Sequence, residues 1–586
     1  MGNYLGAIVL PIKFSWPACG RRRILLWALF LSGVTHPAIA QAPPKIENRP
    51  AIPSTVQPGA IESQYKIDVA QKVTGAATVV SSYEPEQPEN AGDIRFVLRD
   101  LELDGGGSID KSEIASIYAN KIGSEIALSE VFTFARQITK LYSARGYPLS
   151  LAYVPIQEIE DGRVRIRIIE GYVGSVDVIG ADAKTESRLR ALGEKLQTDR
   201  PLTQDALERY LLLANRLPGV KVTGVLERDS AGQGGVKLIL KTEEKNFAVM
   251  VGVNNRASVA VGREQFFGRT SINGLVTGAD SLGFTIVQSF DFDELTFLAG
   301  NFTTALNSEG LTLGIAATRS EAAPGIPFLR DLGFETEGWT AAVNLNYPLL
   351  LRREKSLTIG ATATWKEFNS AFGVSPNTLD QLWITTFDAA YVDRSMLDGV
   401  TAVRVGLSRG WDIFGATMAG DPLASRSGAG AEFLAVNVDV SRSQSVTDWL
   451  NAVLTVKAQA ANNPLLSSEQ CGFGGAGIGR GYDPFTISGD RCIVGQLELQ
   501  ASPQFLTSDN ISVQPYVSVD AGAVRQNGPL AVGENRSASL SSFAAGARIS
   551  LTSHLSLGVE GGLPLKSNAP GADKGMNFFF RLEARY

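Results

Sequence analysis

The stretch WTAAVNLNYPLLLRREKSLTIGATATW, residues 339–365, decides the fold of this chain. In residues 339–347, Trp, Ala, Val, Leu and Tyr occupy alternate positions, and Thr, Ala and Asn fill the positions between them. Residues 357–365 repeat the pattern, with Leu, Ile, Ala and Trp alternating with Thr and Gly. A period of two is typical of β-strands, because successive side chains point to opposite faces. The stretch therefore predicts two strands, each with one apolar face and one polar face.

The same alternation runs from about Phe247 to Tyr586, for example in residues 311–318 and 576–586. A soluble β-sandwich would bury the apolar face, whereas a membrane barrel turns that face to lipid and keeps a polar lumen. Aromatic residues at several strand ends and at the C-terminal position favour the barrel. A repeat of about 21 residues over about 340 residues gives about 16 strands. We therefore expect a transmembrane antiparallel β-barrel over residues 245–586.

Residues 1–40 have the features of a secretory signal peptide. Three arginines, 21–23, precede an apolar stretch, 24–34, and Ala38-Ile39-Ala40 has the small-x-small form of a cleavage site. The apolar stretch is far shorter than the roughly 20 residues that a spanning helix needs. We therefore expect residues 1–40 to be a signal peptide that directs export and is then removed.

The charge and the residue composition exclude several functions. The sequence has 54 basic and 60 acidic residues, and removing the leader's four basic residues leaves 50 against 60. Such an acidic chain lacks the basic surface that binds nucleic acid non-specifically. The leader also contains His36, so a single histidine, His554, remains for catalytic triads or histidine metal clusters. We expect no enzyme activity, no cofactor, no metal site and no nucleic-acid partner.

Two small domains are predicted between the leader and the barrel. Residues 41–92 contain seven prolines, which indicates an extended linker, with a weakly helical segment at about residues 61–73. Residues 93–172 and 173–244 then each have the order strand, helix, helix, strand, strand. In the first unit we expect a strand over residues 94–103, a second helix capped by Ser129, and a strand in which Val164, Ile166 and Ile168 alternate with arginines.

Two motifs carry a resemblance to a known family. Gly479-Arg480-Gly481-Tyr482 lies in a Gly-rich segment, and Asp520-Ala521-Gly522 lies in a late predicted strand. Together with the signal peptide, the two small units and the barrel, they resemble the two-partner secretion translocators. These are the haemolysin and haemagglutinin export pores of the outer-membrane insertase superfamily. The resemblance covers residues 93–586 and identifies the small units as polypeptide-transport-associated (POTRA) domains.

The resemblance implies a location, a partner and a function. The barrel would lie in the lipid bilayer of a Gram-negative outer membrane, with the POTRA domains in the periplasm. The chain would recognise a secreted exoprotein, a large β-helical adhesin or a haemolysin-like protein, and export it. One alternative is an outer-membrane assembly or insertion factor of the same superfamily, which typically has more POTRA domains. The other is a passive porin, which leaves the POTRA pair unexplained.

The resemblance also assigns the loop motif. In the family, a long outer loop folds back into the barrel, and its tip arginine pairs with the aspartate of a late strand, which implies a salt bridge between Arg480 and Asp520. An unpaired buried charge costs several kcal/mol, so the arginine needs a fixed carboxylate. Gly479 and Gly481 let the backbone turn close to the wall. Exchanging the two charges should then restore function.

The family usually also has an amphipathic helix that plugs the pore, and whether residues 61–73 form it stays open.

Two further sets of residues allow more than one interpretation. Cys471 and Cys492 bracket the Arg480 segment. In an oxidising compartment they either form a disulfide or remain free thiols. Arg163, Arg165 and Arg167 form a cationic row on one strand face. Such a row is either a solvated surface or a docking edge for cargo, since a POTRA sheet can add an extended segment as a further strand.

Overall fold

The computed structural model describes residues 54–65, 87–228, 234–508, 511–530, 534–568 and 575–586. The predicted signal peptide, residues 1–40, and most of the predicted linker lie outside the described residues. None of the described helices is both long enough and apolar enough to span a membrane.

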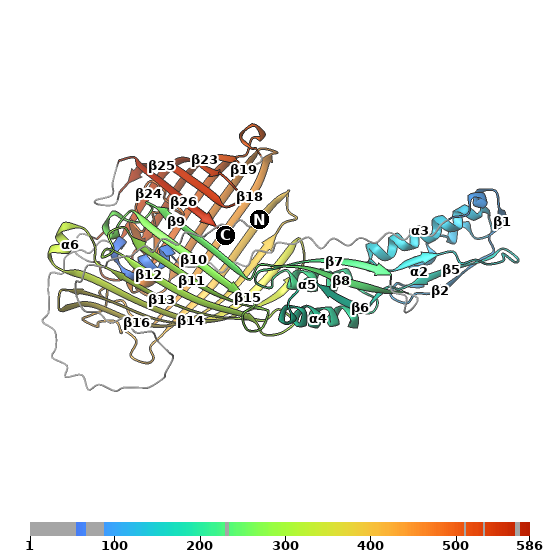
Figure 1. Cartoon of the computed structure of the whole chain (residues 1–586), viewed down its shortest axis with the longest axis horizontal. Coiled ribbons are helices and arrows are strands. Elements are labelled where there is room, and N and C mark those ends of the chain that lie inside the picture. The colour runs from blue at the N-terminus through green and yellow to red at the C-terminus, as the bar shows by residue number, and fades with distance from the viewer. Residues whose placement is uncertain (1–53, 66–86, 229–233, 509–510, 531–533, 569–574) are drawn as a thin grey trace, which may run out of the picture. The chain divides into compact units, whose positions relative to one another are not determined.

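The C-terminal part is a closed barrel of sixteen antiparallel strands, in which the last strand pairs with the first (Figure 1). This confirms the predicted fold class and strand number. The strands are β9 (Phe247–Asn254), β10 (Gln265–Asn273), β11 (Asp280–Ser289), β12 (Thr296–Ala305), β13 (Thr312–Ala322), β14 (Phe334–Leu351), β15 (Lys355–Phe372), β16 (Ser375–Asp393), β17 (Gly399–Trp411), β18 (Phe433–Thr447), β19 (Leu450–Ala461), β22 (Arg491–Ala501), β23 (Ser512–Arg525), β24 (Ser537–Ser550), β25 (Leu555–Ser567) and β26 (Asn577–Arg585).

The two faces of the barrel strands separate as the alternation predicted. In β14 and β15 the register pairs Val343 with Ala363, so the apolar positions of both strands share one face. On that face Val343 and Ile359 are largely exposed, whereas the opposite face carries the buried Thr340. Apolar side chains on the outside of a closed barrel face lipid, because no other protein layer covers them. The apolar face is therefore the outer one.

Two α+β units precede the barrel. The first contains β1 (Arg95–Val97), β2 (Asp100–Gly105), α2 (Lys111–Ala115), β3 (Glu125–Ala127), α3 (Leu128–Ala144), β4 (Leu151–Tyr153) and β5 (Arg163–Ile169). The second contains β6 (Tyr172–Ile179), α4 (Ala183–Thr198), α5 (Gln204–Ala214), β7 (Val220–Arg228) and β8 (Gly235–Glu244). Their sheets have the orders β2-β5-β4 and β6-β8-β7, and β1 pairs with β3. Each unit has its own apolar core beneath its helices.

Two predictions about the first unit were wrong in detail. The strand expected over residues 94–103 is divided into β1 and β2, because the chain changes sheets after the buried Leu98. Up to Leu98 the backbone pairs with β3 and Ser124, and from Asp100 onward it pairs with β5. Ser129 lies inside α3 and does not cap it. The helix begins one residue earlier, where the Glu130 carboxylate accepts the backbone N–H of Ala127.

The second unit contacts one end of the barrel, the end that the resemblance predicts to face the periplasm. Lys184 Nζ donates to the Leu275 carbonyl at 2.7 Å, in the turn between β10 and β11. Lys195 lies 3.0 Å from Glu309 in the turn between β12 and β13. The loops at the other end, among them residues 323–333 with α6 (Pro327–Asp331), are the ones that the resemblance predicts to be extracellular.

The remaining helices are short. α1 (Pro58–Tyr65) follows the 3₁₀ turn η1 (Ser54–Val56) and contacts β13, β14 and β15 of the barrel. The other 3₁₀ turns are η2 (Glu89–Gly92), η3 (Ala119–Lys121), η4 (Val259–Val261), η5 (Ser467–Glu469) and η6 (Gln504–Leu506).

Candidate functional site

A long loop, residues 462–490, joins β19 to β22 at the barrel end opposite the second unit and folds back along the inside of the barrel. It contains η5 and a two-stranded hairpin of β20 (Cys471–Phe473) and β21 (Ile487–Gly489). Phe473 and Tyr482 of the loop are buried in one apolar cluster with Val494, Val524 and Leu540 of the wall strands. We name residues 462–490 the lumen loop and residues 474–486 its tip. Because these apolar contacts hold the tip on the wall strands, the lumen loop fills part of the barrel.

Arg480, at the tip, is buried and ion-paired. Its Nη1 lies 2.5 Å from Glu498 Oε2 on β22 and 3.3 Å from Glu560 Oε2 on β25. Its Nη2 donates to Gln496 Oε1 at 3.3 Å. The planar guanidinium can bond two carboxylates at once, which a compact ammonium does less well. Arg480 thus joins the lumen loop to two different wall strands.

Both carboxylates also have an arginine from outside the lumen loop, on β24 for Glu498 and in the connection between β9 and β10 for Glu560. Arg548 lies 2.8 Å from Glu498, and Arg256 lies 2.8 Å from Glu560. The Glu498 and Glu560 side chains are only 3% and 1% exposed. Charges this deeply buried are stable only when each has a close partner. The wall therefore keeps a paired carboxylate at each position even without the lumen loop, and Arg480 is the cation that the tip contributes.

The expected salt bridge between the Arg480 guanidinium and Asp520 is wrong, because Asp520 binds the backbone of Arg480 instead of its side chain. Asp520 Oδ2 accepts the backbone N–H of Arg480 at 3.0 Å, while the guanidinium extends to Glu498 and Glu560. Asp520 also accepts from the Gln496 amide at 2.8 Å and from the Ser542 hydroxyl at 3.2 Å. Three neutral donors thus satisfy this buried carboxylate, and the long arginine side chain reaches past it. Asp520 holds the tip backbone, and the two glutamates hold the tip charge.

Sequence reasoning missed Glu498 and Glu560. A signal for them existed, because each is an acidic residue at an inward position of an alternating strand, where Leu497, Leu499 and Val559 mark the outer face. An acid on the inner face of a barrel strand needs a partner in the lumen. What the sequence lacks is the identity of that partner.

The predicted glycines allow the tip to lie directly on the wall. Gly479 has φ +92°, a conformation that side chains other than glycine rarely adopt. A Cβ on Gly481 would lie 2.8 Å from Ser542 Cβ, and one on Gly522 would lie 2.3 Å from the Phe473 ring. Glycine is required at these positions because a side chain would collide with the Phe473 ring at Gly522 and with Ser542 and the Leu563 backbone at Gly481.

Tyr482 fixes the tip to a break in the ladder between β24 and β25. Its ring is buried, and its Oη lies 3.2 Å from the Ser541 carbonyl and 3.0 Å from the Lys566 carbonyl. The register between the two strands shifts between Ser541 and Ser542. Such an irregularity interrupts the ladder and leaves backbone groups without a strand partner. The tyrosine hydroxyl supplies a donor to these carbonyls.

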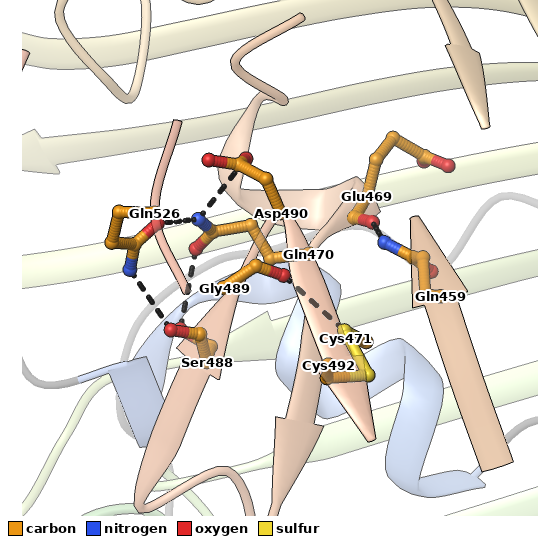
Figure 2. Close-up of a disulfide and its surroundings, with 9 residues drawn as sticks. All are labelled: Gln459, Glu469, Gln470, Cys471, Ser488, Gly489, Asp490, Cys492 and Gln526. Carbon is orange, nitrogen blue, oxygen red and sulfur yellow. Dashed lines mark hydrogen bonds between the residues drawn. A yellow bond between two sulfur atoms is a disulfide. The ribbon is translucent and has the colours of Figure 1, made fainter. Parts of the chain in front are cut away.

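A disulfide joins Cys471 at the start of β20 to Cys492 in β22 (Figure 2). Beside it, the buried Gln470 Nε2 donates a hydrogen bond to Gln526 Oε1 at 2.7 Å, and the Ser488 hydroxyl donates to Gln470 Oε1 at 3.2 Å. Cys471 Sγ also lies 3.3 Å from the Gly489 carbonyl. The root of the lumen loop is therefore attached covalently to the barrel wall.

Replacing both cysteines, C471S/C492S, should loosen the root of the lumen loop without unfolding the barrel. A disulfide that closes a loop of this length stabilises by about 3 kcal/mol. We expect a protease added outside to cut within residues 462–490 faster in the variant than in the untreated protein. Reduction of the unmodified protein should reproduce that change. Identical cleavage rates in the two proteins would show that the disulfide does not restrain the loop.

α1 occupies another part of the barrel interior. Ile61, together with Val56 from the preceding turn, is buried among loop and strand residues that include Leu295 and Phe334. Tyr65 donates through Oη to Gln265 Oε1 at 2.6 Å. The segment therefore does form a helix inside the barrel. The helix begins at Pro58, before the stretch predicted at residues 61–73, and residues 66–73 lie outside the described part.

The cationic row of the first POTRA unit is matched by an acidic row. In the parallel pairing of β2 with β5, Asp100, Glu102 and Asp104 are the register partners of Arg163, Arg165 and Arg167. Arg165 lies 3.0 Å from Glu102, and Arg167 lies 3.0 Å from Asp104. All four of these side chains are substantially exposed. Arg165 and Arg167 therefore form solvent-exposed ion pairs with acidic residues, and their positive charges are already neutralised.

Comparisons with known proteins agree with this architecture. The model of the haemolysin secretion/activation proteins ShlB/FhaC/HecB matches residues 234–549, and that of the ShlB-type POTRA domain matches residues 96–171. The heme/hemopexin transporter protein HuxB of Haemophilus influenzae is 22% identical over 87% of this chain and 91% of its own length. The outer membrane transporter CdiB of Dickeya dadantii is 21% identical over 68% of this chain and 70% of its own.

Solved structures show the same fold. CdiB from Escherichia coli has a TM-score of 0.69 at 19% identity, over 86% of this chain and 93% of that one. CdiB from Acinetobacter baumannii has a TM-score of 0.59 at 15% identity, over 87% and 95%. The family model alone spans more than half of the sequence, including most of the barrel. The chain therefore belongs to the haemolysin secretion/activation family and is an outer-membrane transporter of two-partner secretion, with its POTRA domains in the periplasm.

Proposed function

We propose that the lumen loop is a lid that closes the barrel at rest, and that cargo passes when the tip leaves its seat. The observation that carries this proposal is the ion-paired Arg480 buried against Glu498 and Glu560. The barrel ladder continues from β19 to β22 without the loop, so the loop is not needed to close the sheet. Its seat consists of side-chain contacts and a few backbone bonds, which water can replace once the tip moves.

The cargo that we propose is a large secreted exoprotein, an adhesin or a haemolysin-like protein, that folds into a β-helix outside the cell. Among the relatives, one is named a heme/hemopexin transporter and another an outer membrane transporter. A β-helix forms coil by coil, because each coil contacts only its neighbours. A chain emerging from a pore can therefore fold progressively, and this folding would draw the remainder outward.

The POTRA units are the proposed receptor. Their sheets end in the strands β2 and β4 in the first unit and β6 and β7 in the second. An extended cargo segment can add to such an edge through main-chain hydrogen bonds. Arg163, Arg165 and Arg167 lie on β5, between the two edges of the first sheet. An acidic cargo segment could bind them only by displacing Glu102 and Asp104, so we propose them as secondary contacts.

A reversible lock on the tip tests the lid. Because the Ser258 hydroxyl, in the connection between β9 and β10, donates to the Asp483 carboxylate of the tip at 3.2 Å, the pair S258C/D483C should form a disulfide that keeps the tip in its seat. We expect export to stop in the oxidised variant and to return on reduction. The single variants, and the same pair in the C471S/C492S background, control for the added side chain and for mispairing with the native cysteines. Continued export with the lock fully formed would contradict the proposal.

A further inference from the structure

A single lysine on the barrel wall holds both elements that fill the interior. Lys366 lies on β15, at an inward position opposite Thr340. Its Nζ is 3.0 Å from Glu469 Oε1 in η5 of the lumen loop and 3.4 Å from Glu62 Oε2 in α1. The three side chains are 13–16% exposed. One buried cation thus contacts the helix and the loop at the same time.

The helix and the loop also touch each other directly. A Cβ on Gly59 would lie 2.3 Å from the Cα of Ser468, so the backbones of α1 and η5 are in contact. The Ser54 hydroxyl, just before α1, donates to the Phe485 carbonyl of the tip at 2.5 Å. The contact therefore extends from the root of the lumen loop to its tip. Moving one element changes the surroundings of the other.

The charge balance makes both elements depend on Lys366. Two carboxylates share one ammonium, so without the lysine Glu62 and Glu469 would be buried with no cation between them. Breaking a buried pair by removing one partner is strongly destabilising. When the helix leaves, the pair of Lys366 and Glu469 remains. This pair then becomes exposed to water, and exposed ion pairs contribute little stability. Departure of α1 therefore weakens the bond between Lys366 and Glu469.

We propose that Lys366 is a positioning residue that couples α1 to the lumen loop, so that withdrawal of the helix weakens the seat of the tip. This inference rests on the proposed lid function of the loop. It also gives an order of events. The loop has a covalent anchor at Cys492 and the Arg480 network, whereas α1, which contains no cysteine, is held by side-chain contacts. The helix leaves first, and the tip follows.

A buried serine beneath the tip reports on the coupling. Ser542 on β24 is fully buried and lies under Gly481, while the barrel strands that α1 contacts are β13, β14 and β15. In an S542C chain, labelling by a membrane-impermeant maleimide from outside measures how often the tip leaves. The native cysteines do not react, because they are bonded to each other. All measurements use the complete chain in proteoliposomes, except where the helix is deliberately removed.

In the S542C background we expect K366M to raise the labelling rate about tenfold, because the buried carboxylates lose their cation. Deleting residues 54–65 should raise it to a similar level, and combining the two changes should add nothing. K366R should keep the low rate, since a guanidinium can bond both carboxylates. K457M is the matched control. Lys457 on β19 lies 3.9 Å from Asp439, with both side chains largely exposed, and its loss should not change labelling.

The possible results distinguish a failure of the coupling through Lys366 from a failure of the proposed lid function. If labelling stays at the unmodified level in K366M and in the helix deletion, but rises in R480A, the coupling is wrong and the lid stands. If R480A also leaves labelling unchanged, the lid itself is wrong. Should K366M fail to assemble, E62Q serves in its place. It removes only the charge on the helix and should raise labelling less than K366M, and no rise in E62Q would overturn the coupling.

Discussion

Replacing Arg480 by alanine is expected to release the lumen loop and to reduce export severely while the barrel still assembles. Losing one partner of a buried ion pair costs about 3–5 kcal/mol, which shifts a two-state equilibrium by a hundredfold or more. Glu498 and Glu560 keep Arg548 and Arg256, so the wall network survives and the cost falls on the tip. Single-channel recording in planar bilayers should show more frequent openings. Secretion of the partner should fall in cells, because a tip that no longer returns to its seat leaves the lumen loop loose in the lumen, in the path of the cargo.

Arg548 provides the matched control for this experiment. It lies 2.8 Å from the same Glu498 but belongs to β24 of the wall, and its side chain is 43% exposed. R548A should therefore change export and conductance much less than R480A. The exchange R480D/D520R should not restore export, because Asp520 binds the backbone N–H of Arg480 rather than its guanidinium. Recovery of export in that exchange would contradict the pairing described above.

Deletion of residues 93–172, the first POTRA unit, is expected to abolish export and to leave the pore intact. Each unit has its own apolar core, and Leu149 of the first unit packs against the core of the second, so the deletion uncovers one edge of that core and leaves the rest in place. The second unit, which contacts the periplasmic turns of the barrel, remains in place. Secretion of the partner protein measures the loss, and conductance of the purified variant in bilayers measures whether the barrel has closed.

The same experiment separates the transporter from a passive pore. A porin would lose nothing with its periplasmic domain, so undiminished export after the deletion would refute the receptor role. The triple variant R163A/R165A/R167A is the milder comparison. Because Arg165 and Arg167 are already paired with acids on β2, their loss should reduce export far less than removal of the whole unit.

Local patterns were sufficient for the architecture. The alternation in residues 339–365 reappears as β14 and β15 with the expected faces, because pleating fixes which side chains share a face within any strand. The division of the first unit's strand at Leu98 was not predicted. An uninterrupted apolar pattern looks the same whether the chain continues in one sheet or crosses to another, and only the tertiary partner, here β3, decides.

In the candidate site, too, the residues of the loop were predicted, whereas their tertiary partners were not. The family resemblance identified Gly479, Arg480 and Gly481 as a loop tip, and the structure places all three against the wall. The partner assigned to the arginine by resemblance was the wrong one. Glu498 and Glu560 are inward acids on strands that the sequence separates from each other, and closure of the barrel brings them within 3.3 Å of one guanidinium.

By itself, the sequence determined the barrel, the lipid-facing side of its strands and the two small domains. These depend on backbone geometry, which repeats over two residues in a strand and is fixed locally in a turn. Only the tertiary structure decided which carboxylates bind Arg480, and that Lys366 joins α1 to the lumen loop. Such pairs depend on the stagger of sixteen strands around a closed ladder, and no short stretch of sequence contains that information.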